Sequence, residues 1–133
     1  MRELAEEVDI GGLFGELGAI GRTTAAGAGD YVKRFYSNLG IRENPAIRAA
    51  QEAARVSEEE LDVRRTPLSV AAAVIYMVSQ FSEQRPWLKE ISAATGVAEG
   101  TIRSAYKDLY PRVGKILPSW FANALDLKCL IQP

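Results

Sequence analysis

Residues 70–78 constrain the fold of this sequence most, because they are apolar on every side of a helix. Thr66 and Pro67 precede them, and a capping residue followed by proline is typical of the first turn of a helix. A helix without a polar face is usually buried among other helices. The stretch is far shorter than the ~20 residues that span a bilayer. It therefore predicts a central helix that the rest of the chain must cover.

Start and stop signals place two helices before this segment. Apolar side chains at helical spacing predict a helix from Ala28, and Gly40 is a suitable stop for it. Asn44 and Pro45 open a second helix with the same cap-and-proline signal. The apolar face of this second helix is expected at Ile47, Ala50, Ala54 and Leu61.

Two shorter helices are predicted after the central one. The first covers about residues 87–94, and Gly96 marks the turn that follows it. The second covers residues 98–110 and ends before Pro111, because the residue before a proline disfavours helical backbone. No strand pair or hairpin turn is recognisable. We therefore expect an all-α domain of five helices, the last two of which form a helix-turn-helix.

The 133 residues suffice for one domain with a short segment at each end. Residues 11–29 hold seven of the eleven glycines, and each glycine inside a helix costs ~1 kcal/mol relative to alanine. We therefore expect residues 1–27 to be a mobile, glycine-rich acidic leader and residues 28–118 to be the helical domain. We expect residues 119–133 to be a tail that packs on the domain.

Histidine is absent, and Cys129 is the only cysteine. A Ser-His-Asp triad, a Cys-His dyad and a histidine-ligated zinc site are therefore excluded within the chain. A single cysteine forms no internal disulfide, which indicates a reducing compartment. We expect neither an enzyme nor a bound metal or cofactor. The acidic start resembles no signal or transit peptide, and no membrane association is expected.

The net charge of −1 hides an uneven distribution of charge along the chain. Residues 1–30 carry six acidic and two basic side chains, whereas residues 85–115 carry six basic and three acidic ones. The basic segment favours an anionic partner such as nucleic acid.

Residues 89–109, within this basic segment, match the pattern of a helix-turn-helix. In such a motif an apolar residue packs inward from the first helix, a small residue lies where the helices touch, and a glycine allows the turn. The residues of these types, with the two that close the small core, are Ile91, Ser92, Gly96, Val97 and Ile102. The second helix of such a motif can enter the major groove of DNA.

The exposed side of that second helix supplies candidate DNA contacts. Arginine can donate two hydrogen bonds to the edge of a guanine. Contacts of lysine or arginine with phosphates make the affinity for DNA depend on salt concentration. The residues expected to face bases or the groove are Glu99, Gly100, Arg103 and Ser104. The residues expected to reach phosphates are Arg85, Lys89 and Lys107.

These features also have simpler structural interpretations. The two helices can instead buttress a helical bundle, with solvated charges on its surface. We interpret Trp87 and Trp120 as core or groove-wall residues rather than as ligand-stacking groups. We interpret residues 58–60 and Asp62 as a solvated helix end rather than a metal or acid–base site, because consecutive helical positions point in different directions.

Several stretches resemble, in the right order, the second cyclin-like repeat of general transcription factor IIB, especially its plant forms. They are GDYVKRFYSNLG at residues 29–40, RTPLSVAAAVIYM at 65–77 and GVAEGTIRSAYKDLYP at 96–111, and PSWF at 118–121 is similar to the plant tail. The resemblance covers roughly residues 28–128. It implies a five-helix cyclin-like fold.

The resemblance also implies a function in the nucleus, at RNA polymerase II promoters, in complex with the TATA-binding protein and promoter DNA. In that family this helix-turn-helix contacts DNA upstream of the TATA element. Animal members read bases with a valine and an arginine, whose counterparts here are Gly100 and Arg103. Glycine offers no methyl groups to a base edge, so we expect little base-specific readout.

The zinc ribbon, the reader segment and the first cyclin-like repeat of that family do not fit this sequence. It has no cysteine cluster, and residues 1–27 are too short for a repeat. We therefore expect a fragment or a truncated paralogue that does not recruit RNA polymerase II by itself. The alternative is a cyclin-like protein-interaction module that modulates transcription without binding DNA.

Overall fold

The computed structural model describes residues 27–60, 64–83 and 85–133, so the expected leader lies outside it except for Gly27. The elements are α1 (Ala28–Leu39), α2 (Asn44–Glu60), α3 (Pro67–Ser79), α4 (Leu88–Thr95), α5 (Glu99–Leu109), η1 (Tyr110–Arg112), α6 (Val113–Ile116) and α7 (Ala124–Leu127). No strand occurs within the described ranges, which confirms the all-α class. Within the same ranges, no helix is both long and apolar enough to cross a membrane.

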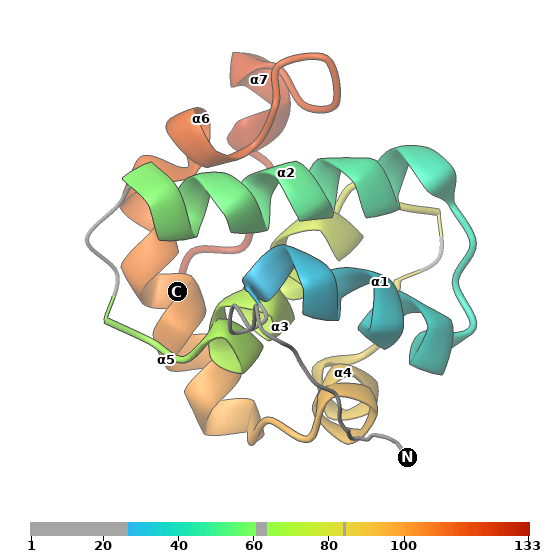
Figure 1. The fold of residues 1–133 in the computed structure, drawn as a ribbon. Helices are drawn as coiled ribbons and strands as arrows, with labels where there is room; N and C mark the ends of the chain where they lie inside the picture. Colours follow the sequence, from blue (N-terminus) through green and yellow to red (C-terminus); the bar gives the residue numbers. More distant parts are fainter. Residues whose placement is uncertain (1–26, 61–63, 84) are drawn as a thin grey trace, which may run out of the picture.

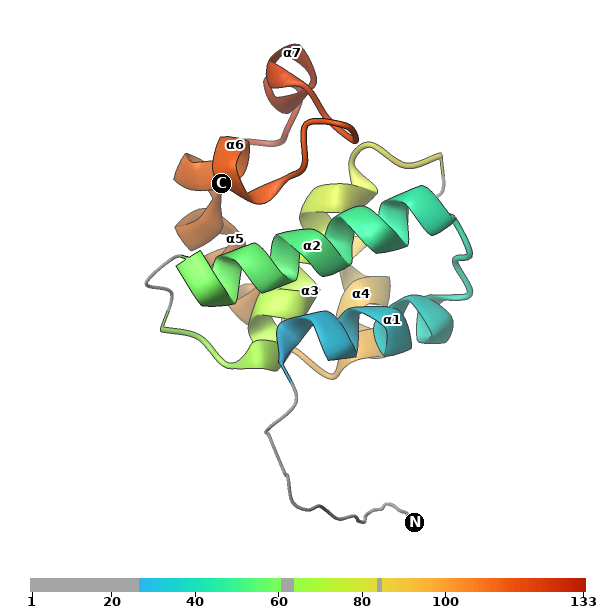
Figure 2. The same cartoon turned by 45° about the horizontal axis from the view of Figure 1, so that its top comes forward.

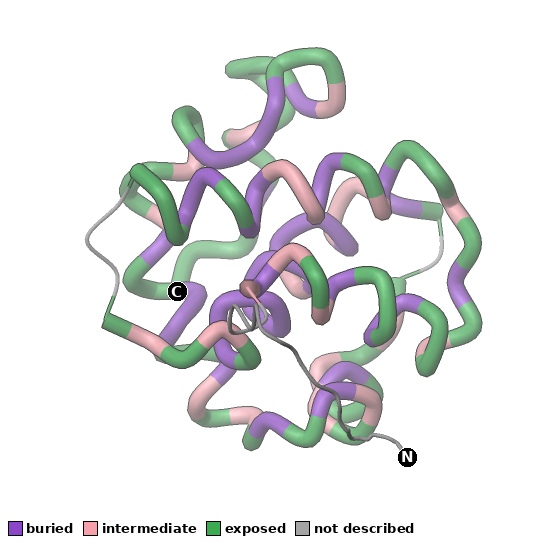
Figure 3. The backbone as a smooth tube through the Cα atoms, viewed as in Figure 1, coloured by how far each residue is buried: buried purple, intermediate pink, exposed green. Residues whose placement is uncertain are grey.

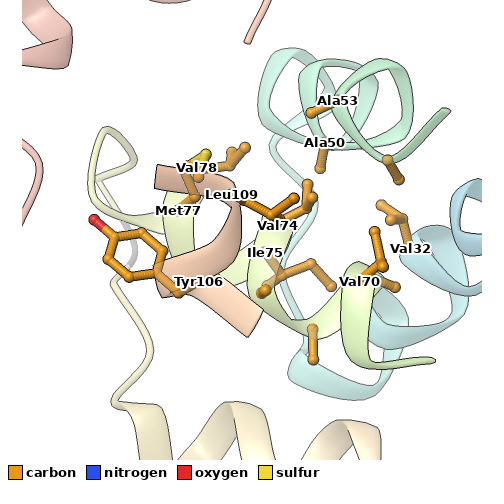
Figure 4. Packing of buried hydrophobic residues seen from close by; sticks show 14 of the residues in the cluster. Val32, Ala50, Ala53, Val70, Val74, Ile75, Met77, Val78, Tyr106 and Leu109 are labelled. Carbon is orange, nitrogen blue, oxygen red and sulfur yellow. The ribbon is translucent and has the colours of Figure 1, made fainter. Parts of the chain in front are cut away.

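Helix α3 is the centre of the fold and packs against α1, α2, α4 and α5 (Figures 1 and 2). Ten of its 13 residues are buried, and Val74 and Ile75 are fully enclosed. Figure 4 shows its valines among side chains of α1, α2 and α5, including Val32, Ala50 and Leu109. The predicted central helix is therefore confirmed.

Helix α2 approaches this core through a stripe of small residues. Alanines spaced by three and four positions turn one face inward, as expected of an amphipathic helix. The buried alanines are Ala46, Ala49, Ala50, Ala53 and Ala54. Ile47 is partly buried and packs against the core at the edge of this face, as predicted, and Leu61 lies outside the described residues. The inward face of α2 is therefore made mainly of alanines.

Two glycines end helices where the sequence predicted. Gly40 and Gly96 have φ angles of 73° and 76°, in the left-handed region that favours glycine. After Gly40, the backbone N–H of Ile41 donates to the carbonyl oxygen of Tyr36 at 3.1 Å. This bond satisfies a carbonyl group at the end of α1.

The acidic end of α2 has a structural role at the start of α1. The carboxylate of Glu58 accepts a hydrogen bond from the backbone N–H of Ala28 at 2.8 Å. A Cβ on Gly27 would lie only 2.9 Å from Glu58 Oε1, so glycine leaves room for this contact. Glu59 pairs with Arg55 at 3.0 Å on the surface of α2. Asp62 lies outside the described residues.

The chain after Pro111 contains short helical elements beyond the five predicted helices. Its Phe121 ring meets the Phe81 ring edge-on, with ring centroids 6.0 Å apart. Farther along, the backbone N–H of Ile131 donates to Gln80 Oε1 at 2.7 Å. The C-terminal residues thus lie against the end of α3.

Trp120 lies on the surface of this C-terminal segment. It is 52% exposed, and the guanidinium of Arg48 lies 5.4 Å from its ring centre. Of the two roles expected for Trp120, that of a core residue is therefore wrong, and that of a groove wall stays a prediction. An arginine over an aromatic face is a cation–π contact, which explains how an exposed indole can be retained at the edge of α2.

Candidate nucleic-acid interface

Helices α4 and α5 form the predicted helix-turn-helix around a small core. Ile91 and Ile102 are fully buried, and Val97 is buried in the turn between the helices. The hydroxyl of Ser92 donates to the carbonyl oxygen of Val97 at 2.6 Å, and the N–H of Val97 donates to Thr95 Oγ1 at 3.1 Å. These bonds fix the turn, and with it the direction in which α5 leaves α4.

The two helices of the motif begin differently. The backbone N–H of Trp87 donates to Glu90 Oε1 at 2.7 Å, which caps the start of α4. Ala98 stands at the cap of α5 with extended backbone and no side-chain hydrogen bond. Alanine is a poor cap, because its side chain cannot accept a hydrogen bond from the first backbone N–H groups. Glu99 is the acidic side chain in the first turn of α5.

Most of the residues predicted to face bases or the groove lie on the solvent side of α5. Gly100, Arg103 and Ser104 are exposed, as is Lys107, while Glu99 is half-buried. Apart from its chain neighbours and the backbone of α5 itself, no heavy atom lies within 4 Å of the place where a Cβ on Gly100 would be, so this part of the helix surface is open. The other side of α5 is buried against α3, and Figure 3 shows the alternation along the helix.

Arg65, in the segment just before α3, reaches this same surface, although the sequence did not single it out. Its Nε donates to Asp108 Oδ2 at 2.8 Å, and its Nη2 donates to Ser104 Oγ at 2.7 Å. The side chain of Arg65 is 25% exposed and that of Asp108 is 48% exposed. Arg65 is 39 positions from Ser104 in sequence, so no local pattern could have linked them.

The residues predicted to contact phosphates lie on three different segments of the chain. Lys107 is exposed on α5, and Lys89 is exposed in the first turn of α4. Arg85 lies in the segment before α4, and its Nη2 donates to the carbonyl oxygen of Gln80 at 2.8 Å. One edge of its guanidinium is therefore directed towards the end of α3.

Two cavities lie beside the start of α4, and both are lined by Arg103, Trp87 and Leu88. One has a volume of about 510 Å³ and also touches Tyr76 and Ile131. The other has a volume of about 610 Å³. Trp87 is 78% exposed, so its interpretation as a core residue is wrong, whereas its interpretation as a groove wall agrees with these cavities.

Behind α5, Tyr106 joins the helix to the C-terminal residues. Its hydroxyl donates to the carbonyl oxygen of Ile131 and accepts a hydrogen bond from Gln80 Nε2 at 3.3 Å. Burial raises the pKa of Tyr106 above its ordinary value of 10.0, so the phenol stays protonated at neutral pH. This network fixes the position of Ile131 in the cavity wall. Gln80 could not be found from the sequence, because Tyr106 and Ile131 are distant from it in the chain.

Comparison with known proteins gives consistent matches. Residues 22–112 match the transcription factor TFIIB repeat family. A transcription initiation factor IIB of Glycine max is 58% identical over 106 residues, which are 80% of this chain and 33% of that protein. The transcription initiation factor IIB of Xenopus laevis is 43% identical over 93 residues, which are 70% of this chain and 29% of that protein.

A plant-specific TFIIB-related protein 2 of Arabidopsis thaliana is 43% identical over 102 residues, covering 74% of this chain and 29% of that protein. The chain thus spans about one-third of the length of the curated relatives it matches. The family match includes α1 to α5 and confirms the resemblance drawn from the motifs. The chain therefore belongs to the transcription factor TFIIB repeat family, with its cyclin-like all-α fold.

Proposed function

We propose that this domain contacts promoter DNA through the solvent side of α5. The observation that carries the proposal is the exposed stripe of Gly100, Arg103 and Lys107 on a helix whose opposite side is fixed in the core. A helix anchored in this way can present its side chains to a major groove without rearrangement. The local excess of basic residues between 85 and 115 supports an anionic partner.

The residues of this surface are proposed to act differently. Lys107 and Lys89 contact phosphates, and each such contact adds about 0.9 to the slope of log affinity against log salt. Arg103 approaches a guanine edge, where an arginine contributes about 1–3 kcal/mol of discrimination. Gly100 adds no methyl group beside it, so the overall sequence preference is small.

We further propose that the domain acts in transcription initiation in the nucleus, on DNA that already carries the TATA-binding protein. The relatives named transcription initiation factor IIB support this part of the proposal. A single helix-turn-helix makes few phosphate contacts, so its own affinity is low. A bound partner that tethers the domain raises its effective concentration at the DNA. The proposal does not extend to recruitment of RNA polymerase II, since the chain spans about one-third of its relatives.

The test is a gel-shift titration on a TATA promoter, with and without TATA-binding protein. We expect weak binding by the domain alone and stronger binding with the TATA-binding protein. Arg103→Glu should abolish both, because it places a carboxylate on the DNA-facing stripe. Arg34→Glu, at an exposed position on α1, makes the same change of charge and should bind as wild type. Equal loss in the two variants, or no binding by wild type, would contradict the proposal.

A second candidate is a protein-interaction module that does not touch DNA. The exposed Trp87 beside a largely apolar cavity of about 510 Å³ favours it, because grooves lined by aromatic side chains can dock peptides. This candidate predicts that Trp87→Ala weakens the assembly with the TATA-binding protein on the promoter, whereas Lys107→Glu, on α5 outside this cavity, leaves it unchanged. The same gel-shift series therefore separates the two functions.

A further inference from the structure

We infer that Arg65 is a positioning residue of the DNA-contacting surface, which neutralises Asp108 and fixes the hydroxyl of Ser104. The inference rests on the proposed function and assigns a role within it to a residue outside the helix-turn-helix. Its basis is the forked contact in which Nε meets Asp108 at 2.8 Å and Nη2 meets Ser104 at 2.7 Å.

Asp108 is an obstacle to DNA binding unless its charge is paired. It follows Lys107 directly and lies one helical turn after Ser104, on the edge of the solvent side of α5. Its side chain is about half exposed. An unpaired carboxylate there would repel a phosphate that approaches Lys107, because charges near a surface interact over several ångströms. With Arg65 alongside, the pair presents no net charge to the DNA.

Arg65 is suited to this role because the backbone next to it is fixed. Thr66 follows it and caps α3, where the N–H of Ser69 donates to Thr66 Oγ1 at 3.2 Å. Helix α3 is the most buried element of the domain, so the start of this side chain is anchored to the core. The planar guanidinium of arginine can also donate hydrogen bonds to two oxygen acceptors at once. The compact ammonium of lysine is less suited to this geometry.

The same contact sets what Ser104 can do. A serine hydroxyl has one hydrogen to donate and oxygen lone pairs that accept. Since Ser104 Oγ accepts from Arg65, its own hydrogen remains for an acceptor on the DNA, such as a phosphate oxygen or guanine N7. Ser104 is thereby assigned as a donor on this surface.

The test is a double-mutant cycle of Arg65→Ala and Asp108→Asn, measured as affinity for the TATA promoter with TATA-binding protein present. Arg65→Ala should weaken binding about three- to fivefold, the range of one partly exposed charge interaction. Asp108→Asn should bind as well as wild type or better. The double variant should return to near the wild-type affinity, because the carboxylate that Arg65 neutralises is then absent.

The matched control is Arg55→Ala, which removes an arginine from the surface ion pair with Glu59 on α2 and should leave affinity unchanged. Melting curves of each variant show whether it is folded, and Arg65→Gln replaces Arg65→Ala if the latter does not fold. If Arg103→Ala weakens binding while Arg65→Ala does not, the inference is overturned and the proposed function stands. If Arg65→Ala stays weak in the double variant, the charge of Asp108 is not what Arg65 offsets, and the neutralising role is overturned. If wild type does not bind, both are overturned.

Discussion

At the scale of single residues, Tyr36 is an unusual member of the core. It is 1% exposed, and its hydroxyl has no hydrogen-bond partner among the residues that the structure describes. Burial, together with the Glu43 carboxylate, raises the pKa of Tyr36 above its ordinary value of 10.0. The unfolded chain therefore loses this proton at a lower pH than the folded chain, and stability falls as pH rises above that value.

Tyr36→Phe should leave the melting temperature at neutral pH unchanged or raise it, because it removes a buried polar atom without a partner. Above pH 10 the variant should become the more stable of the two. Thermal melts at pH 8 and pH 11 measure both effects. The control is Tyr106→Phe, which breaks two hydrogen bonds and should cost about 1 kcal/mol for each. Equal losses in the two variants at neutral pH would contradict this interpretation of Tyr36.

Two glycines of the helix-turn-helix should respond oppositely to the same substitution. Gly96→Ala should destabilise the domain by about 1–2 kcal/mol, because alanine is strained at a positive φ. Gly100→Ala should stabilise it by up to about 1 kcal/mol, because the site is helical and open. Urea denaturation of both variants measures the difference, and changes of the same sign would mean that one of these backbone assignments is wrong.

At the scale of elements, α3 decides whether the domain folds. Val74→Asp buries a carboxylate among apolar side chains and should cost several kcal/mol, on the order of the stability of a small domain. Ala93→Asp, at an exposed position on α4, should have little effect. Circular dichroism melts measure both. A cooperative transition of Val74→Asp near the wild-type temperature would contradict the central position of α3.

The helices that could be predicted from the sequence are those whose start and stop residues lie within a few positions of the helix ends. Thr66 and Pro67 start α3, and the left-handed glycines end α1 and α4, all within a few residues of sequence. The solvent stripe of α5 follows from helical periodicity in the same way. Arg65 was not predictable, because its contacts with Ser104 and Asp108 depend on how α3 packs against α5. The exposure of Trp87 likewise depends on the path of the chain into α4, which no periodicity encodes.

Binding of DNA near the two cavities beside the start of α4 can be monitored through the fluorescence of Trp87. In a Trp120→Phe background, Trp87 is the one remaining tryptophan, and its exposure predicts emission typical of an indole in water. Promoter DNA bound at Arg103 should quench or blue-shift this emission, because the two residues line the same cavities. A fluorescence titration with promoter DNA measures the change. If DNA binds without any change in the emission of Trp87, the contact surface lies away from these cavities.

At the scale of the whole molecule, most of the apolar core and the proposed DNA-contacting surface lie on different helices. Helices α1, α2 and α3 hold most of the apolar core, whereas the exposed basic side chains Arg103 and Lys107 lie on α5. The near-zero total charge therefore says little about DNA binding, and the local charge of the contact surface matters more. Since the proposed surface offers few phosphate contacts, its affinity should depend on salt less steeply than that of a large DNA-binding protein.

The most direct test is therefore the salt dependence of promoter binding in the presence of TATA-binding protein, compared between wild type, Lys107→Ala and Arg103→Ala. Lys107→Ala should weaken binding to every sequence alike and reduce the log–log salt slope by about one, as expected for one lost phosphate contact. Arg103→Ala should cost about 1–3 kcal/mol on a preferred upstream sequence and less on a scrambled one. Affinities and slopes that are the same for all three proteins would contradict DNA contact through α5.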